Sequence, residues 1–286
     1  MKHVFQLGVY GNFWVGLCAV AQAALTYRLI GAECSFYLLG VLFLATFFVY
    51  NIGVLLDYKL LVSNTNKFVS IRTQVINENA TYLIWLIGAA AVLILPITYA
   101  ALKPLSILVF MFAGLISIAY FLPVLPSKKG LRQIPGLKTL SIGLIWTMST
   151  VWIPIIESSI AINNTDLIRL LTERFLLVIV LALVADVRDE AVDRENRLAT
   201  IVTYIGVKKV KYLCIVLLFV QCLWSCVNSN AIHSYLFIAN VAFSIVAIIV
   251  VMHSFNNRSS LYHLFVVDGL TVAQFLMVEI TLVFLV

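Results

Sequence analysis

The sequence repeats one feature throughout its length: apolar runs long enough to cross a membrane, separated by short polar segments. A helix of about 20 apolar residues spans the hydrocarbon core of a bilayer. Of the 286 residues, 63% are hydrophobic and 11% are charged, and the mean hydropathy is +1.06. Soluble domains carry roughly 45–50% apolar and about 25% charged residues. The chain is therefore predicted to be a multi-pass integral membrane protein.

The apolar runs predict an all-α bundle of nine transmembrane helices, with residues 1–286 forming a single membrane domain. The sixth run is short, and we expect its helix to continue into the acidic segment that follows it. The nine predicted runs are Phe13–Leu29, Phe36–Leu56, Tyr82–Ala101, Leu105–Val124, Leu140–Ile160, Phe175–Ala185, Val210–Val227, Ser234–Met252 and Phe265–Val286.

Lys and Arg are distributed unevenly between the two sides of this predicted bundle. Arg28, Lys103, Arg169 and Arg174 fall on one side, and the other 15 of the 19 basic residues fall on the side of the N-terminus. Cytoplasmic loops are enriched in Lys and Arg, so the N-terminus and the basic loops are predicted to be cytoplasmic. The same bias explains the pI near 9.1 without a nucleic-acid partner.

The stretch "LALVADVRDEAVDRENRLAT" ends the sixth run with a cluster of acids, and Asp186, Asp189 and Asp193 are spaced at i, i+3 and i+7. In a continuing helix these positions share one face. Their carboxylates repel one another unless a cation lies between them, and Mg²⁺ bridges carboxylates to substrate phosphates. The spacing therefore favours a site for a metal-bound diphosphate, and a solvated helix end is the alternative.

Two predicted cytoplasmic loops carry the basic residues that a diphosphate would also require. Arg suits bidentate phosphate contacts, and Lys contributes a point charge. Anionic lipid headgroups are the alternative partners of such loops. We expect two or three of these side chains to contact a substrate. The basic residues are Lys59, Lys67 and Arg72 in one loop, and Lys128, Lys129, Arg132 and Lys138 in the other.

The acidic cluster resembles the second motif of the UbiA superfamily of membrane prenyltransferases, D-x-x-D-x-x-x-D-x-x-x-G-x-x-T followed by a leucine-glycine pair. That family has nine helices, with one acidic motif at the end of helix 2 and one at the end of helix 6. Arg197 stands here in place of the motif's glycine, and Ile205 in place of its leucine. The residues in register with the motif are Asp186, Asp189, Asp193, Thr200 and Gly206.

The first motif of the family, N-D-x-x-D-x-x-x-D, is degenerate in this chain. The segment "NIGVLLDYK" keeps Asn51, but Ile52, Leu55 and Lys59 stand where the aspartates belong. Asp57 is the only nearby acid and lies two residues out of register. Either a single metal remains on the side of Asp189 and Asp193, with Lys59, Lys67 or Arg72 replacing the missing positive charge, or catalysis has been lost.

The resemblance implies transfer of an isoprenoid group from a prenyl diphosphate to a small aromatic or lipidic acceptor, assisted by Mg²⁺ at the cytoplasmic face. It implies catalytic roles for Asn51, Asp186, Asp189 and Asp193, and a metal site of Asp57 with the same three aspartates. The residues that it implies for diphosphate binding are Lys59, Lys67, Arg72, Lys128, Arg132 and Lys138.

Two other classes of function stay open. A non-catalytic isoprenoid- or lipid-binding membrane protein would keep the fold without the first motif. An ion-coupled transporter is the weakest alternative, because the acids cluster at a helix end and no Gly/Pro-interrupted helix pair marks a midplane site. The expected location is the lipid bilayer of a bacterial inner membrane.

Overall fold

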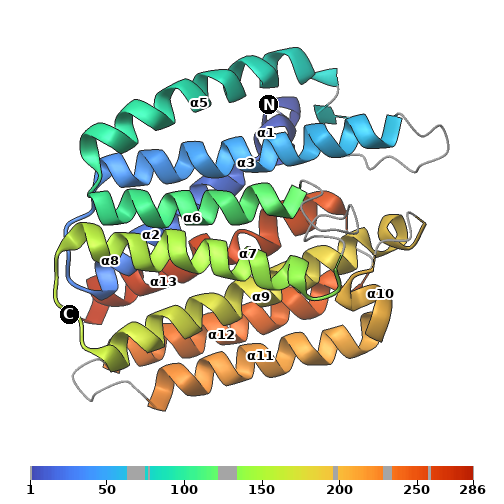
Figure 1. The fold of residues 1–286 in the computed structure, drawn as a ribbon. Helices are drawn as coiled ribbons and strands as arrows, with labels where there is room; N and C mark the ends of the chain where they lie inside the picture. Colours follow the sequence, from blue (N-terminus) through green and yellow to red (C-terminus); the bar gives the residue numbers. More distant parts are fainter. Residues whose placement is uncertain are drawn as a thin grey trace.

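The computed structural model describes residues 2–62, 75–76, 78–121, 134–195, 199–227, 234–256 and 259–285. Within these ranges the chain is helical and forms no strand, and the long helices run roughly parallel or antiparallel to one another (Figure 1). The predicted all-α membrane bundle is confirmed. The nine-span count and the cytoplasmic N-terminus stay predictions.

The helices follow the predicted apolar runs in order. The π-helical turn η2 lies between α7 and α8, and the π-helical turn η4 precedes α13. The elements are α1 (Lys2–Tyr10), α2 (Phe13–Leu29), α3 (Phe36–Val62), α5 (Ala80–Ala101), α6 (Pro104–Phe121), α7 (Leu137–Thr147), η2 (Met148–Trp152), α8 (Ile153–Ser158), α9 (Asn164–Glu195), α10 (Ile201–Ile205), α11 (Val207–Val227), α12 (Ser234–Ser254), η4 (Tyr262–Val267) and α13 (Leu270–Leu285).

Among the described residues, five helices are long and apolar enough to cross a membrane by length and composition. Their outward faces carry large apolar side chains, such as Trp85, Tyr99 and Phe284, which are strongly exposed. Large exposed apolar side chains on long apolar helices are typical of a protein surface that faces lipid. The five spans are Phe36–Leu55, Ala80–Ala101, Leu137–Ser158, Leu236–Ser254 and Tyr262–Phe284, with shorter apolar helices at Phe13–Leu29 and Pro104–Tyr120.

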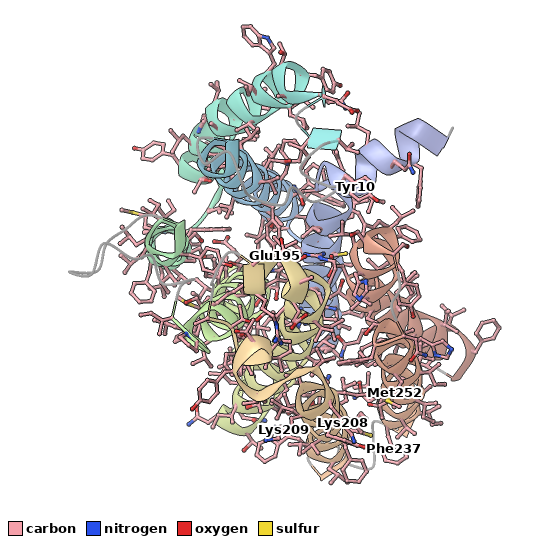
Figure 2. All side chains as sticks on the ribbon, turned by 90° about the vertical axis from the view of Figure 1, so that its right-hand side faces the viewer. Tyr10, Glu195, Lys208, Lys209, Phe237 and Met252 are labelled. Atoms are coloured by element: carbon pink, nitrogen blue, oxygen red, sulfur yellow. The ribbon has the colours of Figure 1, made fainter. Side chains whose placement is uncertain are left out.

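Helix α9 is the central element of one half of the bundle, and its residues Leu177–Val184 are all buried. It begins well before the predicted sixth run and continues through the acidic segment to Glu195. The three aspartates therefore lie on a helix, as the spacing predicted. Figure 2 shows Glu195 near the middle of the bundle end that faces the viewer.

Helix α7 lies directly against α9, and Gly143 allows this close approach. A Cβ at position 143 would lie 2.8 Å from Phe175 Cε2 and 3.0 Å from Ile179 Cδ1. A larger side chain would separate the two helices. The contact therefore brings the N-terminal end of α7 close to the acidic end of α9.

Helix α2 crosses the bundle with a row of polar side chains that donate hydrogen bonds to backbone carbonyls. Trp14 Nε1 donates to Phe265 O at 3.0 Å, and Thr26 Oγ1 donates to Thr150 O at 2.6 Å. Both acceptors lie in the π-helical turns, where the regular i→i−4 backbone hydrogen bonds of an α-helix are interrupted. Side chains of α2 therefore satisfy backbone groups at both irregular turns.

Candidate functional site

Lys138, the second residue of α7, lies between two aspartates of α9. Its Nζ is 2.6 Å from Asp186 Oδ1 and 4.0 Å from Asp193 Oδ2. The two aspartates are seven residues apart, which is about two helical turns, so they share one face of α9. The structure thus joins one predicted diphosphate-binding residue with two predicted metal ligands.

Both aspartates are buried, at 1% exposure for Asp186 and 6% for Asp193. Burial raises the pKa of the Asp193 carboxyl to about 6, although the Lys138 ammonium opposes this shift. Burial likewise raises the pKa of Asp186, again against the effect of Lys138. A buried carboxylate is costly unless it is paired. One ammonium shared by two carboxylates leaves one negative charge uncompensated.

Asp189 has a different partner, because both of its oxygens accept hydrogen bonds from Arg188. The Nε of Arg188 donates to Oδ1 at 2.8 Å, and Nη2 donates to Oδ2 at 2.7 Å. This is the bidentate guanidinium–carboxylate geometry that makes strong ion pairs. The charge of Asp189 is therefore already balanced within α9.

Asn51, the residue of the first motif that this chain keeps, joins two helical segments by its amide. It is fully buried. Its Nδ2 donates to Gly11 O at 3.0 Å and to Phe47 O at 2.8 Å. Its Oδ1 accepts a bond of 3.0 Å from Asn12 Nδ2. These bonds give Asn51 a structural role at the junction of α1, α2 and α3, whether or not it also acts in catalysis.

Thr200 and Gly206, which match the second motif, shape the turn after α9. Thr200 caps α10 by exchanging reciprocal hydrogen bonds with Thr203. Gly206 has a φ of +87°, a value that favours glycine. The two residues define the short helix that returns the chain into α11.

The remaining predicted site residues cannot be placed by their side chains. Asp57 and Lys59 lie on α3, but their side chains are outside the described part of the chain. Lys67, Arg72, Lys128, Lys129 and Arg132 lie outside the described residues altogether. Their roles stay predictions.

The structure adds residues of the C-terminal segment that sequence spacing did not place at the site. Asp268 interacts electrostatically with Arg188. His263 interacts electrostatically with both Arg188 and Asp189. His263 is 4% exposed. Its Nδ1 lies 3.1 Å from Ser259 O, and its Nε2 makes no hydrogen bond with the described residues. No periodicity or motif links η4 to α9, so only the fold brings these groups together.

Two carboxylate oxygens at this site are candidates to hold a cation. Asp186 Oδ2 and Asp193 Oδ2 are buried and make no hydrogen bond with the rest of the described chain. One or two carboxylates are enough for Mg²⁺ when substrate phosphates complete its coordination. Within the same ranges no three His, Cys, Asp or Glu side chains converge, so a closed all-protein metal site is not formed there.

The fold and the site define a helical membrane protein with paired carboxylates and basic groups at one end of its bundle. Solved structures of a UbiA homolog from Archaeoglobus fulgidus share this fold. The one bound to GPP and Mg²⁺ has a TM-score of 0.69 at 11% identity, covering 97% of this chain and 99% of that chain. The one bound to DMAPP and Mg²⁺ has a TM-score of 0.64 at 13% identity, covering 96% and 98%. The one bound to Cd²⁺ has a TM-score of 0.58 at 14% identity, covering 96% and 99%.

The predicted resemblance to the UbiA superfamily is confirmed as a likeness of fold over nearly the whole chain. No protein-family model and no curated protein matches the sequence. At these identities the likeness shows the fold, and the chemistry has to be argued from the residues of this chain.

Proposed function

We propose that this protein binds a prenyl diphosphate at the acidic end of α9 and transfers its isoprenoid group to a small aromatic or lipidic acceptor. The observation that carries the proposal is the buried Asp186–Lys138–Asp193 cluster. It lies in a bundle with the fold of a UbiA homolog whose solved structures are bound to GPP or DMAPP with Mg²⁺.

The reaction requires positive charge beside the diphosphate and an interior without water. When the allylic C–O bond breaks, its electron pair stays on the diphosphate oxygen, and positively charged groups stabilise that charge. The acceptor then supplies the electron pair for the new bond to the prenyl carbon and loses a proton. The apolar bundle accommodates the isoprenoid tail and excludes water that would quench the carbocation.

Lys138 is the described cation best placed for the leaving group. Its ammonium has three N–H donors, and the contact with Asp186 uses one of them. Asp186 and Asp193 would hold a divalent ion, which would supply further positive charge to the phosphate oxygens. The basic residues of the two predicted cytoplasmic loops would complete the anion site, and the proposed reaction takes place at the cytoplasmic face of a bacterial inner membrane.

A second candidate function is isoprenoid or lipid binding without catalysis. Ile52 and Leu55, at the aspartate positions of the first motif, pack against the apolar cluster around Phe47 and Leu83. This part of α3 therefore offers hydrocarbon contacts where the family motif offers carboxylates. Such a protein would hold the prenyl chain without cleaving its diphosphate.

The test is binding of geranyl diphosphate to purified protein in nanodiscs, measured with Mg²⁺ and with EDTA. Asp186→Asn and Asp193→Asn are the site variants. Asp166→Asn is the matched control, because Asp166 lies in the first turn of the same helix and pairs with Arg169 instead. Geranyl monophosphate and geraniol are the ligand controls.

With Mg²⁺ present, we expect binding that requires the diphosphate group and that falls at least about tenfold in the two site variants, because the ion bridges their carboxylates to the phosphate oxygens. The control should bind like the wild type. Diphosphate release with a panel of phenolic and lipidic acceptors then separates transferase from binding protein. Equal binding of geraniol, or unchanged binding by the site variants, would reject the diphosphate site.

A further inference from the structure

Lys138 is held in the position that a cation between Asp186 and Asp193 would take. Its Nζ contacts Asp186 Oδ1 at 2.6 Å and lies 4.0 Å from Asp193 Oδ2, and its side chain is only 19% exposed. The close packing at Gly143 holds α7, and with it Lys138, beside α9. The ammonium is thus built into the site by the packing of two helices.

A second divalent ion has few ligands left among the described side chains. Arg188 occupies both oxygens of Asp189, and Ile52 and Leu55 present no oxygen at the end of α3. Asp186 Oδ2 remains without a hydrogen bond, and Asp193 Oδ2 has only its 4.0 Å ion-pair contact with Lys138. The net charge of the cluster also favours a single divalent ion, because two carboxylates and one ammonium leave a single negative charge.

We propose that Lys138 is a fixed cation of this site that takes the place of one divalent ion and competes with the remaining ion for Asp186. This inference rests on the proposed function, since it assigns Lys138 a double effect on ligands of that site. The ammonium repels a divalent ion beside Asp186 and attracts a diphosphate.

Lys138 is expected to lower the affinity for a divalent ion and to raise the affinity for a diphosphate. Its replacement should therefore change the two affinities in opposite directions. Replacing Lys138 by the similarly long, uncharged methionine removes a like charge next to the metal and frees the second oxygen of Asp186. Divalent-ion affinity should then rise. The same replacement removes a positive charge from the diphosphate site, so binding of diphosphate without metal should fall. A variant that only damaged the fold would weaken both.

The experiment measures Mn²⁺ binding by electron paramagnetic resonance of the free ion, without any prenyl diphosphate, for protein in nanodiscs. Geranyl diphosphate binding in EDTA is measured in parallel. The variants are Lys138→Met, Lys138→Arg, which keeps the charge, and Lys209→Met, which removes an exposed lysine at the start of α11. Figure 2 shows Lys209 at the edge of the bundle, away from Glu195.

For Lys138→Met we expect Mn²⁺ to bind about tenfold more tightly, or better, and geranyl diphosphate in EDTA to bind at least about tenfold more weakly, which is the size of effect that a close charge produces. Lys138→Arg and Lys209→Met should stay near the wild type in both assays. If Lys138→Met does not give a monodisperse protein, Lys138→Gln takes its place.

Unchanged or weaker Mn²⁺ binding by the uncharged variant would overturn the inference, as would a wild type and variant that both fail to bind Mn²⁺. A different result would reject the proposed function. If no form binds geranyl diphosphate under any condition, the prenyl-diphosphate proposal is wrong, and the Mn²⁺ measurement still decides whether Lys138 competes with a metal.

Discussion

Gly143 of α7 and Phe175 of α9 are so close that a Cβ at position 143 would lie 2.8 Å from Phe175 Cε2. A Cβ atom cannot come this near to a ring carbon without a clash. The lack of a side chain at Gly143 therefore allows the close spacing of α7 and α9. Lys138 lies five residues earlier on α7, and its contact with Asp186 depends on this spacing. Packing in the apolar interior therefore controls the geometry of the charged site.

We predict that Gly143→Ala destabilises the protein by about 1–3 kcal/mol, the usual effect of overpacking a filled core. Gly114→Ala in α6 is the control, because a Cβ there meets nothing within 4 Å and alanine favours a helix. Unfolding in mixed micelles of dodecyl maltoside and sodium dodecyl sulfate measures both. Equal stability of the two variants would show that α7 and α9 tolerate a wider separation.

Asn51→Ala is predicted to destabilise the fold by about 1–3 kcal/mol, because it removes the buried hydrogen bonds of Asn51 with Asn12, Gly11 and Phe47. The melting temperature, followed by fluorescence-detected gel filtration, should therefore fall. A variant with an unchanged melting temperature that loses only geranyl diphosphate binding would contradict this structural role.

Arg188 and Asp189 are predicted to be energetically coupled. Arg188→Gln and Asp189→Asn each remove half of a bidentate ion pair, and the double variant removes the whole pair. We expect the double variant to be more stable than the sum of the single effects implies, with a coupling energy of about 0.5–3 kcal/mol. The stabilities come from the same mixed-micelle unfolding. Strict additivity would show that the pair contributes nothing to the fold.

Thr200→Ala is predicted to reduce stability by about 1 kcal/mol through loss of the helix cap on α10. Thr200→Ser keeps the hydroxyl and should retain most of the stability. Mixed-micelle unfolding distinguishes the two. Divalent-ion binding should stay unchanged in both, because Thr200 has a capping role in this structure, and a loss of Mn²⁺ affinity in Thr200→Ala would place it in the cation site.

Much of the fold could be predicted because apolar runs of membrane length and i, i+3, i+7 spacing are local signals. They located α9 and placed Asp186, Asp189 and Asp193 on a helix. They also gave the resemblance to the UbiA superfamily, which the fold confirms.

The partners of those aspartates could not be predicted in the same way. Arg188 is adjacent to Asp189 in sequence, but side-chain pairing on a helix depends on rotamers that a sequence does not reveal. Lys138 and His263 reach the site through helix packing at Gly143 and through the π-helical turn η4. Such long-range contacts leave no periodic pattern in the sequence.

The contact between Lys138 and Asp186 has a consequence for biosynthesis. Ribosomes make α7 before α9, so Lys138 is synthesised before its acidic partner exists. The ion pair can therefore form only after α9 has been made and has packed against α7, so it closes late in the folding of the chain.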